Sequence, residues 1–275
     1  MSRKIHFSKE SQSSMIDFFS HREMEKQEHR EEEHMPKSLA VVSRTDVGKV
    51  RANNQDAPIV SEKLRVFGVA DGMGGHKGGE VASAGARDAL LEALNGQEPS
   101  AQALRAAIEK ANEAIFHQQE KDDALTGMGT TLSVLWMSDA FVYIGHVGDS
   151  RVYLMRDGKL VQKTTDHSLV EQMVQEGILT EKEAENHPLR NIITRAVGTE
   201  ETVDVDLLVD ERHTGDTWLI CSDGLHGMVE KSVLNDALRM KVIEKSADKL
   251  LKAALDAGGK DNVTLVIVHD GEERA

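Results

Sequence analysis

The sequence predicts an α+β fold, in which layers of helix pack on antiparallel strands. Two helical patterns follow one another directly, at 79–94 and from Ser100 onward, and strand-like runs lie on either side of this pair. A meander of short apolar segments then occupies 130–163. Because repeated βαβ units would place a single helix between successive strands, these observations favour a layered α+β arrangement over a doubly wound parallel sheet.

The helices are recognised by apolar stripes and by their terminal residues. Gly96 ends the first helix, and Ser100, whose hydroxyl can accept a hydrogen bond from a free backbone N–H, begins the second. A further helical stretch covers 233–257 and ends at Gly258-Gly259. The expected buried faces are Ala82, Ala86, Leu90 and Ala93 in the first helix and Leu104, Ala107, Ile108, Ala111 and Ile115 in the second.

Strands are predicted where short apolar or alternating runs stop at polar or glycine-containing turns. Arg156-Asp157-Gly158-Lys159 lies between two alternating runs and indicates a hairpin, so we interpret this Asp-Gly pair as purely structural. The predicted strands are 39–43, 57–61, 64–70, 130–137, 141–147, 151–155, 160–163, 202–209, 217–221 and 263–268.

Short helices interrupt the strand pattern between 164 and 201. Asp166 or Ser168 caps the first of them and Gly177 ends it, and Thr180-Glu181-Lys182-Glu183 has the form of a capping box for the next. We interpret the segment as a helical insertion between two strands.

Length and composition indicate one large globular domain with an appendage, because the 275 residues are 39% hydrophobic and 29% charged. The net charge of −14 argues against nucleic acid or an anionic membrane as a partner. Cys221 is the lone cysteine, which excludes an internal disulfide and fits a reducing compartment. The first residues lead to no signal-peptide core, and no apolar run reaches the length of a membrane span. We therefore expect a cytoplasmic protein.

Residues 1–36 differ in composition from the rest and are expected to form a charged N-terminal extension. The stretch 21–34 is densely charged with mixed sign, and a solvated, partly disordered surface is favoured there over metal binding by its histidines. The Phe18-Phe19 pair could dock on a partner or on the globular domain.

Five aspartates occupy the ends of predicted strands. Asp71, Asp149 and Asp223 each follow an apolar strand, whereas Asp56 and Asp261 each precede one. Antiparallel pairing would carry all of them to the same sheet edge. Carboxylates gathered away from bulk water repel one another unless a cation is present. Oxygen ligands without a Cys or His cluster predict Mg²⁺ or Mn²⁺ rather than zinc, and a bridged pair of ions is plausible.

The glycines around Asp71 raise a second class of function, nucleotide binding. Neither the dinucleotide fingerprint nor the phosphate-binding loop with its terminal Lys-Ser/Thr fits the spacing of 72–79. Asp-Gly pairs are also common in turns, and we interpret Asp270-Gly271 in that way. Asp71 and Asp223 differ because each follows an apolar strand and is accompanied by Gly or Ser.

Six short motifs together resemble, in order, those of the metal-dependent protein phosphatases of type 2C in their bacterial form, over about 37–270. The resemblance implies a four-layer αββα fold, an antiparallel β-sandwich flanked by pairs of helices. It also implies a serine/threonine protein phosphatase. The motifs are Arg51-Ala52-Asn53-Asn54-Gln55-Asp56, Asp71-Gly72-Met73-Gly74-Gly75-His76, Gly129-Thr130-Thr131, Gly148-Asp149-Ser150-Arg151, Ser222-Asp223-Gly224 and Asp261-Asn262.

The resemblance also implies a distribution of metal ligands. Asp71 bridges two metal ions, and Asp223, Asp261 and the carbonyl of Gly72 complete one side. Asp56 binds or orients water at the other ion. Asp149 and Asp223 belong to a third, weaker site, while Ser222 and Asn262 support the ligands beside them.

Two residues of the motifs are expected to act on the substrate. Arg51 is the candidate phosphate clamp, because a guanidinium can bind two phosphate oxygens at once, and a surface ion pair is the alternative. His76 is the candidate general acid, with a structural histidine as the alternative. Met73-Gly74-Gly75 separates it from Asp71-Gly72, whereas in many eukaryotic members of the family the histidine directly follows Asp-Gly. Gln55 stands where other members have Glu, which removes one carboxylate from the metal site.

The implied substrates are phosphoserine and phosphothreonine proteins, made by a cognate kinase and processed by a monomeric enzyme. We expect 164–201, which includes Ser168 and Arg190, to form a mobile flap that governs substrate choice, with a permanently packed subdomain as the alternative. A catalytically inactive metal-binding module with the same fold is the competing function.

Overall fold

The computed structural model of the protein describes residues 38–185 and 187–271, with the backbone alone at 75–77. Residues from Ser38 onward form one compact unit. The extension predicted at 1–36 lies outside the described residues. Within these residues, no helix combines the length and the apolar character needed to cross a membrane.

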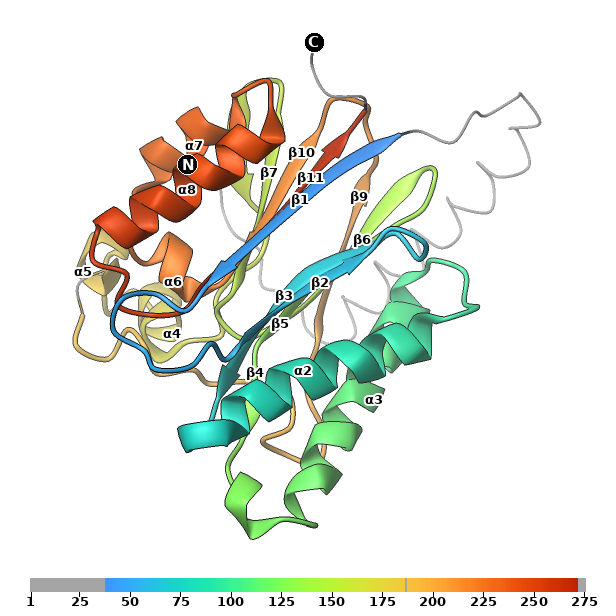
Figure 1. The fold of residues 1–275 in the computed structure, drawn as a ribbon, viewed down its shortest axis with the longest axis vertical. Helices are drawn as coiled ribbons and strands as arrows, with labels where there is room; N and C mark the ends of the chain where they lie inside the picture. The colour runs from blue at the N-terminus through green and yellow to red at the C-terminus, as the bar shows by residue number, and fades with distance from the viewer. Residues whose placement is uncertain (1–37, 186, 272–275) are drawn as a thin grey trace. The chain divides into compact units, whose positions relative to one another are not determined.

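Two antiparallel sheets form the centre of this unit (Figure 1). Side chains from both sheets meet in one apolar layer, in which Phe67 and Ile144 of one sheet pack with Trp218 and Val266 of the other. The first sheet has the order β1 (Leu39–Asp46), β11 (Val263–Asp270), β10 (Thr217–Cys221), β7 (Arg151–Arg156) and β8 (Lys159–Gln162). The second has the order β2 (Asp56–Ser61), β3 (Val66–Met73), β5 (Leu132–Met137), β6 (Phe141–Val147) and β9 (Asp206–Glu211), and β4 (Gly129–Thr130) pairs with β3.

A pair of helices covers the outer face of each sheet, as Figure 1 shows. On the second sheet these are α2 (Gly75–Leu94) and α3 (Ala101–Gln119), which η1 (Asp123–Leu125) follows. On the first sheet they are α7 (Lys231–Leu238) and α8 (Ile243–Asp256). The predicted sandwich with flanking helix pairs, αββα, is confirmed. The short helices α4 (Leu169–Gln175), α5 (Glu181–Glu185) and α6 (Asp223–His226) lie in connections between strands.

Several predicted helix caps and one predicted hairpin turn are present in the structure. The Ser100 hydroxyl accepts a hydrogen bond from the N–H of Ala103, and the predicted face of α3 is buried. The Thr180 hydroxyl accepts from the N–H of Glu183, whose carboxylate accepts from the N–H of Thr180, and this reciprocal pair is the capping box. Asp157 and Gly158 both have positive φ, 51° and 71°, as a two-residue turn between β7 and β8 requires.

Some predicted boundaries were wrong. The helix expected at 233–257 is two helices, because the buried positions Leu238 and Ile243 are five residues apart and cannot share one helical face. The strand expected from Leu64 begins at Val66, since Arg65 belongs to a turn and has φ 53°. The strand expected at 202–209 begins only at Asp206. Asp206 pairs with His146, which is the last residue of β6 in this pairing.

Two smaller corrections concern the second sheet and its helix. The strand expected at 130–137 is broken at Thr131, whose N–H donates to the carbonyl of Asp71 at 2.8 Å instead of joining a regular ladder. On α2, Leu94 is fully buried, while Ala93, expected on the buried face, is only half-buried.

Candidate metal centre

Asp56 and Asp71 lie opposite one another on neighbouring strands. Asp56 is the first residue of β2, and the antiparallel register places it across from Asp71 near the end of β3. The N–H of Gly72 donates to the carbonyl of Gln55 at 3.0 Å, which closes this end of the pair. A Cβ at Gly72 would lie 2.0 Å from the carbonyl oxygen of Gly79, so only glycine fits beside Asp71.

The other sheet supplies Asp223 and Asp261 at the same end of the sandwich. Asp223 is the first residue of α6, separated from the end of β10 by Ser222, and Asp261 lies just before β11. Ser222 joins the two sheets, because its hydroxyl donates to Asp56 Oδ2 at 2.8 Å. The expectation that the five acids share one sheet edge was therefore wrong in one respect. They come from the matching ends of two facing sheets, since β10 and β11 belong to a different sheet from β2, β3 and β6.

The electrostatics of the carboxylates fit a bound cation. Burial raises the pKa of Asp56 to about 6, that of Asp223 to about 6 and that of Asp149 to about 8, and nearby carboxylates add to each of these shifts. Burial, followed by the charges of Asp56, Asp223, Asp149 and Asp261, raises the pKa of Asp71 well above its usual value. Each carboxyl group is thus destabilised in its ionised form by the others, and a cation would remove this cost.

Two buried oxygens in this group have no hydrogen-bond partner within the described residues, Asp56 Oδ1 and Asp149 Oδ1. Unpaired buried carboxylate oxygens are costly and are the natural ligands of Mg²⁺ and Mn²⁺. Across 38–185 and 187–271, no group of three His, Cys, Asp or Glu side chains is spaced to hold a metal ion. The fit therefore rests on charge and on these two oxygens rather than on a formed coordination sphere.

Arg51 lies on the rim of the acidic group, about half exposed at 52%, and its Nη2 is 2.7 Å from Asp261 Oδ2. Asn262 fixes the loop that carries it. The side-chain amide of Asn262 donates to the carbonyls of Val47 and Asn53, each at 2.9 Å, and its Oδ1 accepts from the N–H of Gln55 at 2.8 Å. One buried side chain thereby holds both ends of the Arg51 loop beside β11.

Gln55 and His76 both belong to the region where β3 meets α2. The Gln55 side chain packs against Gly79 so closely that a Cβ there would lie 2.8 Å from its amide carbon. This contact directs the Gln55 side chain toward α2. The backbone of His76 is in the first turn of α2, but its side chain lies outside what the structure describes.

Asp149 has neighbours that the sequence did not reveal. Arg151 makes a bidentate ion pair with Asp166, with N–O distances of 2.7 to 3.1 Å, and the charge of Asp166 contributes to the raised pKa of Asp149. His226 Nε2 donates to the backbone carbonyl of Asp149 at 3.0 Å, and burial lowers the pKa of His226 to about 3. Asp166 was considered only as a helix cap, because no sequence pattern pairs it with Arg151.

The insertion 164–201 has a fixed base and an exposed middle. Ser168, rather than Asp166, caps α4 by accepting from the N–H of Glu171 at 3.3 Å. The base is held at one end by the N–H of His167, which donates to the carbonyl of Gly148 at 2.8 Å, and at the other by two bonds between Val197 and Thr130. Arg190 is exposed in the middle of the segment. Mobility of that middle part stays a prediction.

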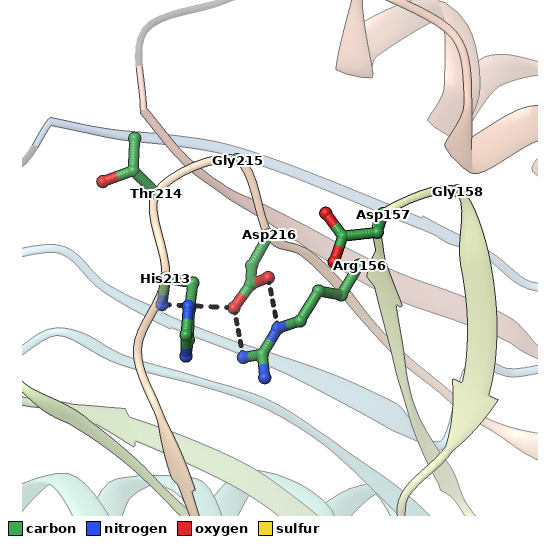
Figure 2. A pocket seen from close by; sticks show the side chains of 7 residues that line it. All are labelled: Arg156, Asp157, Gly158, His213, Thr214, Gly215 and Asp216. Carbon is green, nitrogen blue, oxygen red and sulfur yellow. Dashed lines mark hydrogen bonds and ion pairs between the residues drawn. The ribbon is translucent and has the colours of Figure 1, made fainter.

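A cavity of about 240 Å³ lies far from these acids (Figure 2). Its lining is the turn of Arg156–Gly158 and the turn of His213–Asp216, at the opposite ends of β7 and β10 from Arg151 and Cys221. That separation is about 17 Å along β7, at about 3.4 Å per residue. The Arg156 guanidinium already binds both carboxylate oxygens of Asp216, at 2.8 and 2.7 Å. The cavity therefore offers no free cation to an anionic ligand.

Comparisons with known proteins agree with this geometry. A profile of the protein phosphatase 2C family matches residues 48–258. Serine/threonine protein phosphatase PstP of Mycobacterium tuberculosis (strain H37Rv) is 42% identical over 232 residues, covering 83% of this chain and 44% of that protein, so the chain spans less than half of its length. Serine/threonine phosphatase stp of Listeria monocytogenes (strain EGD-e) is 41% identical over 235 residues, which cover 82% and 93% of the two chains.

A solved structure of one of these relatives has the same fold as this chain. The crystal structure of the catalytic domain of PstP in complex with two manganese ions superposes on this chain with a TM-score of 0.78. The two are 39% identical, and the match covers 85% of this chain and 99% of that one.

Proposed function

The chain belongs to the protein phosphatase 2C family, and on this premise we propose that it is a metal-dependent protein phosphatase that removes phosphate from serine and threonine residues. The observation that carries the proposal is the group of acids at one end of the sandwich. Burial, followed by the charges of neighbouring acids, raises the pKa of aspartates from two facing sheets there, and two of their buried oxygens have no described partner. The relatives that match most of this chain include phosphatases from two bacterial genera.

In this proposal Asp71 would hold two Mn²⁺ or Mg²⁺ ions together with other oxygen ligands. Asp223, Asp261 and the Gly72 carbonyl would serve one ion and Asp56 the other. Asp149 and Asp223 would hold a third ion more weakly. Bound divalent ions would supply positive charge opposite the phosphoryl group and lower the pKa of water at the site. The opposed positions of Asp56 and Asp71, and the hydrogen bond from Ser222 to Asp56, support this assignment.

The roles of the remaining residues follow from where they lie. Arg51 binds the phosphate, because it is exposed on the rim and its loop is held in place by Asn262. Gln55 carries no charge, and its side chain lies against α2, so we assign it a packing role beside the metals rather than metal binding. His76 remains the candidate general acid by its place in the motif.

We place the substrates among phosphoproteins made by a serine/threonine kinase of the same cell, with the segment 164–201 contributing to their selection. Arg190 is an exposed cation in that segment and suits a phosphoprotein surface. We further propose a monomer that acts in the cytoplasm, in keeping with a single, buried cysteine and a net charge of −14.

Hydrolysis of an aryl phosphate and of a phosphothreonine peptide by the purified chain tests the proposal. We expect turnover of both with Mn²⁺ or Mg²⁺ and none after exhaustive chelation. Turnover that survived chelation, or that required zinc, would contradict the metal assignment. Binding of Mn²⁺ without any turnover would instead favour the inactive metal-binding module.

A further inference from the structure

A buried chain of hydroxyl and imidazole groups runs from the end of β3 to the base of the 164–201 segment. It comprises Thr131, Ser150, Ser133 and His146, and each of these side chains is at most 1% exposed. The motif Gly129-Thr130-Thr131 contributes the first member, yet none of these groups has a place in the proposed chemistry. Burying four polar side chains costs free energy, because each loses its hydration on folding, so we expect this group to perform a role.

Thr131 forms the first link, to Asp71. The N–H of Asp71 donates to Thr131 Oγ1 at 3.0 Å, and the N–H of Thr131 donates to the carbonyl of Asp71 at 2.8 Å. This reciprocal pair holds the backbone of Asp71 from two directions. The carboxylate of Asp71 can then occupy only the positions that its own side-chain rotamers allow.

The second link connects Thr131 to the turn that carries Asp149. Thr131 Oγ1 and Ser150 Oγ are 2.8 Å apart. Gly148, on the other side of Asp149, has φ 107°, and a Cβ there would lie 2.6 Å from Thr131 Cβ. Thr131 therefore touches the residues on both sides of Asp149, by a hydrogen bond to one and by close packing on the other.

The remaining links reach the base of the insertion. The Ser133 hydroxyl lies 3.0 Å from the carbonyl of Ser150 and 2.8 Å from His146 Nδ1, and His146 Nε2 lies 3.0 Å from the carbonyl of Thr165. A carbonyl can only accept, so Nε2 carries the ring proton in a neutral His146, and the single proton of the Ser133 hydroxyl goes either to the Ser150 carbonyl or to His146 Nδ1. The chain thus ends on a backbone group of the segment expected to select substrates.

We propose that Thr131 is a positioning residue, whose hydroxyl fixes the end of β3 against the Gly148–Ser150 turn and so sets Asp71 relative to Asp149 for metal binding. The inference rests on the proposed metal-dependent function. In the motif Gly129-Thr130-Thr131, the second threonine would thus hold Asp71 in position. A residue of the same shape without a hydroxyl, such as valine, could not do so.

Mn²⁺ titration calorimetry on the full chain tests this with Thr131→Val, Thr131→Ser and a matched control, Thr217→Val. Thr217 is also buried, and its hydroxyl bonds to His269 Nδ1 at 2.9 Å, but it begins β10 at the end opposite Asp223. Because Thr131→Val leaves the buried N–H of Asp71 without its acceptor, we expect Mn²⁺ affinity to fall at least about tenfold, the effect of one lost buried hydrogen bond. Thr131→Ser should retain the affinity of the wild type, and so should Thr217→Val, even though its melting temperature falls.

The possible outcomes distinguish a failure of the positioning role of Thr131 from a failure of the proposed metal-dependent function. Wild-type affinity in Thr131→Val, or equal losses in Thr131→Val and Thr217→Val, would overturn the positioning role, because the hydroxyl would then serve stability alone. If Thr131→Val does not fold, Ser150→Ala removes the same link from its other side and is expected to weaken Mn²⁺ binding in the same direction, and unchanged binding there overturns the role. A wild-type chain that bound no Mn²⁺ would overturn the proposed function, and this inference with it.

Discussion

The hydroxyl of Ser222, at the end of β10 in one sheet, donates a 2.8 Å hydrogen bond to Asp56 Oδ2, at the start of β2 in the other. The same hydroxyl accepts from the N–H of Thr264 at 3.0 Å, so Ser222 is itself held in place by β11. This bond joins the two halves of the acidic group, and it occupies one oxygen of Asp56, while the other has no hydrogen-bond partner in the part of the chain that the structure describes.

Ser222→Ala should therefore weaken both folding and metal binding. We expect a loss of about 1–3 kcal/mol in the free energy of unfolding, because a buried carboxylate loses a donor. Urea unfolding and Mn²⁺ titration measure the two effects. Ser246→Ala serves as the control, since the Ser246 hydroxyl bonds to the carbonyl of Ala237 between α7 and α8 and should affect stability alone. Unchanged Mn²⁺ affinity in Ser222→Ala would contradict the bridging role.

Asp71→Asn should stabilise the metal-free protein and abolish turnover. Burial, followed by the charges of the neighbouring carboxylates, raises the pKa of Asp71 well above its usual value, so a neutral amide of the same shape removes both costs of an ionised side chain. Melting temperatures in a chelator should rise in the variant, whereas the increase that Mn²⁺ gives to the wild type should largely disappear. Full activity in Asp71→Asn or Asp71→Ala would rule out a bridging ligand at this position.

The stability of the metal-free protein should fall as pH rises from about 6.5 to 8. Burial and neighbouring acids raise the pKa of Asp149 to about 8 in the folded state. The folded state therefore holds a proton that the unfolded chain releases near pH 4, and the stability linked to that proton is lost as pH rises through the folded pKa. Melting temperatures across this range measure the slope, and Asp149→Asn should reduce it without removing the part due to Asp71, whose pKa is raised as well.

Two buried histidines limit this experiment to the upper pH range. Burial lowers the pKa of His146 to about 4 and that of His226 to about 3. Below about pH 6.5 the unfolded chain therefore binds protons at these histidines that the folded state does not, which favours unfolding. Their contribution has the opposite slope and is absent above that pH. A slope between pH 6.5 and 8 that was the same in the wild type and in Asp149→Asn would show that Asp149 does not carry this proton.

Arg51→Ala should raise KM about tenfold or more for both an aryl phosphate and a phosphopeptide, with a smaller change in kcat, because a charged hydrogen bond to phosphate is worth about 1.5–3 kcal/mol. Steady-state kinetics measure this. Arg44→Ala is the matched control, because Arg44 makes a similar ion pair of 2.8 Å with Asp248 of α8 instead of with one of the five acids. A drop in kcat with unchanged KM would argue against phosphate binding by Arg51.

Arg190→Ala should lower kcat/KM for phosphopeptides several-fold more than for a small aryl phosphate. The segment around Arg190 is exposed, and its two ends are bonded to Gly148 and Thr130, so its side chains can meet a peptide without altering the metal ligands. Lys182→Ala, another exposed cation of the same segment, provides the control. Equal losses on both substrates would indicate that Arg190 supports the fold or the metal centre instead.

Much of the fold was predictable because its signals are local. Apolar runs of strand length, caps at Ser100 and Thr180, and the Asp157-Gly158 turn each depend on neighbouring residues, and each appears in the structure. The acids were found in the same way, by their positions at strand ends. The assignment of those strands to two sheets was missed, because pairing partners such as β1 and β11 are far apart in sequence and similar in composition.

The contacts that sequence reasoning missed are long-range and polar. Nothing in the pattern pairs Arg151 with Asp166, or Thr131 with Ser150, since each residue has several plausible partners within reach of a turn. The break between α7 and α8 was readable in principle, because the spacing of Leu238 and Ile243 departs from the helical period. The choice between Asp166 and Ser168 as a cap depended on the partner of Asp166.

The position of β11 also orders events during synthesis. β11 is the last strand of the described residues, yet it lies between β1 and β10, with Leu39 of the first described strand opposite Asp270 of the last. Asp261 precedes it, so the acidic group is incomplete until residue 261 has left the ribosome. β1 must wait for the synthesis of β11 before it can pair, and such distant pairing slows folding. A nascent chain truncated before residue 261 therefore lacks one acid of the proposed metal site, which ties the proposed activity to the synthesis of β11.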